Sequence, residues 1–139
     1  MRKVSHILDS KGRRVVSVPQ EAPVLAAYTY PLIMRRRYNE SNGATGAFVV
    51  VTNASWGIDG GQPADSPLWC AMFDTLGAAG VLSCGATANN QVDVDVVGDM
   101  PTACPSDYLI SVTATDVNDE RTFSAYGLTS VDVGAPGAA

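Results

Sequence analysis

Two continuous apolar runs of strand length constrain the fold of this chain more than any other feature. Residues 47–53 read Ala-Phe-Val-Val-Val-Thr-Asn, and residues 81–84 read Val-Leu-Ser-Cys. A run without polar alternation is typical of a strand that is buried on both faces, as in a parallel sheet covered by helices. We therefore expect both runs to be buried strands of one sheet.

A segment with helical spacing precedes each run. Residues 21–39 predict a helix with Pro23 in its first turn, a bend near Pro31, and an end at Asn42 and Gly43. A second helix is expected to begin at Ser66-Pro67 and end at Gly80. The residues expected on its buried face are Leu68, Met72, Leu76 and Ala79.

These segments alternate in the order that parallel sheets require. Further strands are expected at residues 108–114 and 131–133, with a turn-bounded segment at 121–127 between them. Strand–helix–strand units join parallel strands by right-handed crossovers. The predicted fold class is α/β, three-layered, with a mostly parallel sheet flanked by helices. The 139 residues suffice for one domain, which we assign to 21–139, after a divergent segment at 1–20.

Charge and hydropathy exclude two classes of partner. The net charge of −5 leaves no basic stripe to replace phosphate counterions, so a nucleic-acid partner is not expected. No run approaches the roughly 20 apolar residues that cross a bilayer, so no membrane span is expected. The start of the sequence is too polar for a signal peptide, and localisation stays open.

The cysteines predict neither a zinc site nor a disulfide framework. Cys70, Cys84 and Cys104 are three, so at most one disulfide can form, and no Cys-x-x-Cys pair is present. Buried free thiols are the expectation. Cys84 is expected to pack in the core, because a nucleophilic thiol needs a nearby base and His6 is the only histidine.

Residues 80–90 are where we expect a functional site. An apolar run breaks here into small residues and then into Asn89 and Asn90. A buried parallel strand delivers polar side chains in this way to the carboxyl edge of its sheet, where ligands bind. Asn89 is the first candidate. The alternative is that Asn89 forms a turn by bonding to neighbouring backbone.

Six blocks of the sequence, in order, resemble subtilisin-like serine peptidases (subtilases), and they extend from about Pro23 to Gly137. The resemblance identifies the chain as a partial subtilase catalytic domain, whose parent activity is peptide-bond hydrolysis. The blocks are residues 42–43 with 53–57, 76–82, 86–89, 109–116, 123–127 and 131–137.

The resemblance implies roles for seven residues. Asn89 matches the asparagine whose amide donates to the oxyanion, an interaction that contributes about 3 kcal/mol to transition-state stabilisation. Ser55, Trp56 and Gly57 match the extended segment that pairs with substrate backbone. The small-residue wall of the pocket for the residue before the scissile bond corresponds to Ala86, Thr87 and Ala88. Trp56 either shapes a specificity subsite or caps the core.

The same resemblance implies an incomplete catalytic triad. No His-Gly-Thr motif is present, and Ser130 precedes Ala135-Pro136-Gly137 instead of following it in a Gly-Thr-Ser motif. Because nucleophile and base are missing, the chain alone is expected to be inactive. The alternative is a non-catalytic module that binds an extended peptide by strand addition. An unrelated nucleotide-binding domain is disfavoured, since no glycine-rich phosphate loop follows a predicted strand.

Cofactor and oligomer expectations complete the prediction. No cofactor is expected. Asp93, Asp95 and Asp99 lie in a long loop at residues 91–105 whose spacing lacks an EF-hand pattern, so a solvated acidic loop is favoured over calcium binding, which the family makes possible. The expected partner is a polypeptide substrate or an extended peptide. A sheet without flanking strands leaves unpaired edges, which predicts homo-oligomers.

Overall fold

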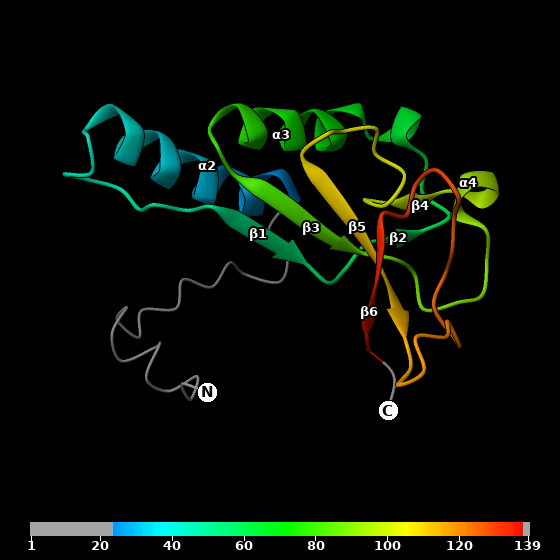
Figure 1. Cartoon of the computed structure of the whole chain (residues 1–139). Helices are drawn as coiled ribbons and strands as arrows, with labels where there is room; N and C mark the ends of the chain where they lie inside the picture. Colours follow the sequence, from blue (N-terminus) through cyan, green and yellow to red (C-terminus); the bar gives the residue numbers. More distant parts are fainter. Residues whose placement is uncertain (1–23, 138–139) are drawn as a thin grey trace.

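The computed structural model describes residues 24–137, and the predicted segment 1–20 lies outside this range. Two long helices and a four-stranded sheet make up most of it (Figure 1). The helices are α2 (Val24–Glu40), α3 (Pro67–Ala78), the short α4 (Val94–Val97) and a 3₁₀ turn (Pro63–Asp65). The strands are β1 (Val51–Ala54), β2 (Ile58–Asp59), β3 (Leu82–Ala86), β4 (Asp99–Met100), β5 (Leu109–Thr115) and β6 (Val133–Pro136).

The main sheet is parallel throughout, as the sequence predicts. Its strand order is β1-β3-β5-β6, and each neighbouring pair runs in the same direction. A separate antiparallel pair joins β2 to β4. This small pair matters for the site, because it places the segment after β1 beside the loop that follows α4.

Only one face of the sheet is covered by helices within the described residues, so the three-layer prediction is not met there. One core cluster contains Tyr28 and Leu32 of α2 together with Phe73 and Leu76 of α3, and it rests on Leu109 of β5. Both long helices therefore pack on the same side of the sheet (Figure 1). On the other face, apolar side chains are exposed: Val51 (50%), Leu82 (36%) and Val133 (48%).

The open face and the sheet edge explain why the first apolar run is not buried as predicted. Strand β1 begins at Val51 and is the outermost strand, so its free edge has no partner among the described residues. Phe48 and Val50, which precede it, are 60% and 49% exposed. An edge strand covered on one side buries half of its side chains at most. The predicted self-association through such edges stays a prediction.

Helix α3 has nearly the predicted bounds, and of its predicted buried face Leu76 is in the core while Met72 and Ala79 pack partly buried against it. Trp69, Phe73 and Leu76 face the core, whereas Leu68, which was expected there, is 70% exposed. The apolar residues of this helix form two overlapping stripes. The stripe with the two large aromatic rings lies against the sheet, because it removes more apolar area from water.

The expectation of free thiols is wrong for two of the three cysteines. Cys70 of α3 and Cys104, in the loop after β4, form a disulfide across a sequence separation of 34. Cys84 of β3 is free and half-buried. Among residues 24–137, no helix combines the length and the apolar character that crossing a bilayer requires.

Candidate functional site

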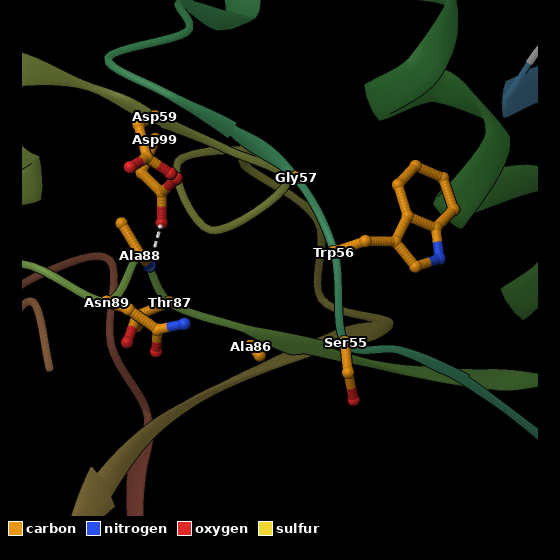
Figure 2. A pocket seen from close by; sticks show the side chains of 9 residues that line it. All are labelled: Ser55, Trp56, Gly57, Asp59, Ala86, Thr87, Ala88, Asn89 and Asp99. Carbon is orange, nitrogen blue, oxygen red and sulfur yellow. Dashed lines mark hydrogen bonds between the residues drawn. The ribbon is translucent and has the colours of Figure 1, made fainter.

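A pocket of about 270 Å³ lies beyond the carboxyl ends of β1 and β3. Two extended segments form its walls: residues 55–59 on one side and residues 86–89 on the other (Figure 2). The structure brings all seven residues predicted from the sequence to this one pocket, and it adds two carboxylates. The lining residues are Ser55, Trp56, Gly57, Asp59, Ala86, Thr87, Ala88, Asn89 and Asp99.

Asn89 is exposed at the mouth of this pocket, directly after the buried Thr87 and Ala88. Within residues 24–137 its side-chain amide makes no hydrogen bond, although the residues on either side of it do. A turn-forming asparagine would bond to nearby backbone, and no such bond is present. The amide of Asn89 is thus free to donate to a ligand.

The backbone of residues 55–57 is also free. Strand β1 pairs with β3 only as far as Ala54, and β2 begins at Ile58. Between them, no backbone hydrogen bond to Ser55, Trp56 or Gly57 is formed within the described part of the chain. Exposed, extended and unpaired backbone can accept an added peptide strand.

The Trp56 side chain packs against aromatic rings of the core but stays 43% exposed, so it agrees with a core cap, and the specificity subsite stays a prediction. Its ring stacks on Trp69 with centroids 5.4 Å apart, and it contacts Tyr28 at 6.0 Å. Figure 2 shows the indole turned away from Asn89 and the two carboxylates. The ring itself therefore contributes to the helix–sheet packing, and Trp56 borders the pocket without filling it.

The opposite wall is held by hydrogen bonds to neighbouring segments of the chain. The Thr87 and Ser124 hydroxyl oxygens lie 2.8 Å apart. The Ala88 N–H donates to Asp99 Oδ2 at 2.9 Å, and the Ala88 carbonyl accepts from the Ala125 N–H. These contacts, together with the packing of Ala88 against Val94 and Ala125, fix the small residues of the wall.

The sequence reasoning missed Asp59 and Asp99 as pocket residues. Asp59 carried one usable signal: it lies two residues after Gly57, so the two share a face of an extended segment. The sequence pattern places Asp99 in a solvated acidic loop. Asp99 is only 2% exposed, so that prediction is wrong for this residue.

The other two aspartates of that loop have structural partners. Asp93 caps α4 by accepting from the Asp95 N–H, and Asp95 accepts from the N–H groups of Thr129 and Ser130. In the part of the chain that the structure describes, no group of three His, Cys, Asp or Glu residues could hold a metal ion.

Burial raises the pKa of the Asp99 carboxyl above its ordinary value. Hydrogen bonds from Thr102 and from the Ala88 N–H act in the opposite direction, and the charge of Asp59 adds to the rise. The folded chain therefore binds this proton more tightly than the unfolded chain. By linkage, the stability that Asp99 contributes is full below the unfolded pKa and is lost as pH rises through the folded pKa.

We expect the pH-dependent contribution of Asp99 to stability to appear when the wild type is compared with an Asp99→Asn variant. The stability of the wild type relative to the variant should be greatest below about pH 3.8, the ordinary pKa. It should decrease as pH rises through the higher folded pKa. Thermal unfolding of both proteins from acid to neutral pH measures this difference. Asp107→Asn, which removes an exposed charge outside the pocket, is the control. A relative stability of the wild type that increases with pH would contradict the assignment.

Comparisons with known proteins give matches in structure only. No protein-family model matches the chain, and no curated protein sequence matches it either. The epidermin leader peptide processing serine protease (EpiP) from Staphylococcus aureus superimposes with a TM-score of 0.61 at 17% identity, over 88% of this chain. A lanthipeptide protease superimposes with a TM-score of 0.53 at 18% identity, over 76% of this chain. The chain spans about a third of the length of these structures (32% and 33%).

These findings correct the family prediction. No family model matches the chain, and its structural neighbours are described as a leader peptide processing serine protease and a lanthipeptide protease. Membership in the subtilisin-like family is therefore not upheld. At 17–18% identity the likeness shows the fold alone. The chain therefore has a parallel α/β sheet whose fold is similar to part of these proteases.

Proposed function

We propose that this chain forms the substrate-binding part of a serine-protease-type domain and holds an extended peptide between residues 55–57 and 86–89. The observation that carries the proposal is the pocket, in which all seven predicted residues line two facing segments. The unpaired backbone of residues 55–57 supports it, because main-chain bonds to a peptide strand would satisfy these groups. The similarity in fold to two proteases agrees with a polypeptide ligand.

Asn89 is the proposed donor to the oxyanion of a bound peptide. Its amide is exposed at the mouth of the pocket and free of partners among residues 24–137. A preorganised amide of this kind stabilises negative charge that develops on a carbonyl oxygen. A product-like peptide that ends in a carboxylate presents the same kind of charged oxygen.

Hydrolysis by this chain alone is not expected. A serine nucleophile requires an adjacent base, and residues 24–137 contain no histidine. Of the serines near the pocket, Ser55 accepts a hydrogen bond from the Asn53 amide and Ser124 bonds to Thr87. Neither contact supplies a base. This absence is also what favours the second candidate, a peptide-binding module without catalysis.

Calorimetric titration with a matched pair of extended peptides, one ending in a carboxylate and one in an amide, tests the proposal. We expect saturable binding of both without cleavage. Binding of the carboxylate form should weaken about tenfold in Asn89→Ala, since a hydrogen bond to a charged group contributes on the order of 1.5–3 kcal/mol. The amide form should be nearly unaffected.

The outcomes separate the two candidates. Equal effects of Asn89→Ala on both peptides would leave a binding module and remove the oxyanion role. Absence of binding by either peptide would contradict the groove itself. Cleavage by the purified chain, abolished in Asn89→Ala, would show that a nucleophile and base are present after all.

A further inference from the structure

Two carboxylates lie side by side at one end of the pocket. Asp59 of β2 and Asp99 of β4 are directly opposite each other in the antiparallel register, so their side chains project from the same face of this pair. Figure 2 shows them next to each other, on the far side of Ala88 from Ala86. Both residues line the pocket.

Within residues 24–137, no cation neutralises either carboxylate. Asp99 Oδ2 accepts from the Ala88 N–H and from the Thr102 hydroxyl, both at 2.9 Å, while its second oxygen has no partner among the described residues. The only described bond to Asp59 comes from the Asn90 amide, at 3.3 Å. No described arginine or lysine forms an ion pair with either residue. Asp99 is 2% exposed as a residue, but its second oxygen is not one of the fully buried atoms that lack a partner, so a ligand in the pocket can reach it.

Two of the four arginines in residues 24–137 bond to groups outside the pocket, and none of the four lines it. Arg35 donates to the carbonyl oxygens of Ala79 and Val49. Arg121 lies over the ring of Tyr126 and donates to the Ser124 carbonyl. The pocket thus combines two close negative charges with small apolar walls, and within residues 24–137 it contains no counter-ion.

We propose that Asp59 and Asp99 determine specificity by receiving the guanidinium of an arginine side chain of the bound peptide. This inference rests on the proposed function, because it places that arginine immediately before the bond that faces Asn89. The short side chains of Ala86 and Ala88 leave room for the apolar stem of an arginine. The planar guanidinium offers five donors, enough to reach both carboxylates at once.

The electrostatics of the pocket agree with a cationic ligand. Two like charges in a partly dry site repel each other, and Asp59 contributes in this way to the raised pKa of Asp99. A bound guanidinium would reverse this repulsion. It would also satisfy the second oxygen of Asp99, which no uncharged aliphatic side chain could do.

Binding of two peptides that differ only in one residue tests the inference. One peptide ends in arginine and the other in citrulline, which keeps the shape of the side chain but has no charge. We expect the arginine peptide to bind about tenfold more tightly, since charge-assisted hydrogen bonds are roughly twice as strong as neutral ones. Asp59→Asn should remove this preference, whereas Asp107→Asn, which removes the same charge outside the pocket, should retain it.

A binding measurement with a small molecule distinguishes a wrong arginine preference from a wrong proposed function. Benzamidine carries a planar cation but makes no strand contacts, so its binding reports on the carboxylates alone. Equal binding of both peptides would overturn the arginine preference and leave the groove intact. If neither peptide binds, the proposed function fails, and the binding of benzamidine then tests the carboxylates by themselves. Benzamidine binding that is lost in Asp59→Asn would support a cation site at Asp59 and Asp99. Absence of benzamidine binding would overturn that site.

Discussion

Replacing Gly57 by alanine is expected to destabilise the chain by about 3 kcal/mol, at the upper end of what overpacking costs. A Cβ atom at this position would lie 2.0 Å from the carbonyl oxygen of Met100, closer than real Cβ contacts come. The position of a Cβ is fixed by the backbone, and the Met100 oxygen belongs to the backbone, so neither atom can rotate away. The segment before β2 must move from β4, which breaks the pairing of Ile58 with Met100 and of Asp59 with Asp99.

Thermal unfolding measures this effect as a decrease in Tm of about 10 °C for a chain of this size. Gly134→Ala is the matched control. Its new Cβ would lie 2.9 Å from the Thr115 Cγ2 methyl, which belongs to a side chain that can shift. We expect the control to lower Tm much less. A Gly57→Ala protein as stable as the control would show that residues 57 and 100 are not in close contact.

Gly57→Ala should also abolish peptide binding in whatever fraction remains folded. The pocket wall at residues 55–57 and the carboxylate at Asp59 belong to the same extended segment. When this segment moves away from β4, Asp59 separates from Asp99. The variant therefore tests whether peptide binding depends on the β2–β4 pair. Titration of the variant with the arginine peptide measures the expected loss of binding.

Removing the Cys70–Cys104 disulfide is expected to have a similar effect on stability. The bond closes a loop with a sequence separation of 34, and the chain-entropy model gives about 4 kcal/mol for a loop of this length. The bond also joins α3 to the segment that follows β4, which carries Asp99 and Met100. A double Cys70→Ser, Cys104→Ser variant should unfold at a markedly lower temperature than the wild type.

Counting reactive thiols checks independently that Cys70 and Cys104 form a disulfide. The unfolded, unreduced chain should show one reactive thiol, that of Cys84, and reduction should raise the number to the three cysteines of the sequence. Cys84→Ser, which leaves the disulfide in place, should be close to the wild type in Tm. Three reactive thiols before reduction would show that the disulfide is not formed.

Much of the fold could be predicted because it depends on local patterns. The helical spacing of residues 66–79 and the strand run at 109–114 each produce an element at nearly the expected bounds. The alternation of strands and helices also predicted the parallel direction of the sheet. Errors appear where an element depends on what lies next to it: the exposure of Phe48 follows from the edge of the sheet, and the outward position of Leu68 follows from the burial of Trp69 and Phe73.

The candidate site also contains residues that the sequence predicts and residues that it does not. The break from a strand into small residues and an amide predicted Asn89 at the carboxyl edge of the sheet, whereas residues 55–57 and 86–88 were expected beside it only from the resemblance to subtilases. Their roles in binding remain predictions. Asp99 could not be distinguished from Asp93 and Asp95 by sequence, since all three are aspartates of one acidic loop and only one of them is buried.

The sequence by itself determined the order and direction of the strands and the small, polar composition of the pocket walls, because periodicity and turn chemistry act over a few residues. Only the tertiary structure decided which carboxylates meet in the pocket, which cysteines pair and which sheet face stays open. Each of these depends on contacts between segments far apart in the chain, such as β2 with β4 and Cys70 with Cys104. Local pattern carries no information about such distances.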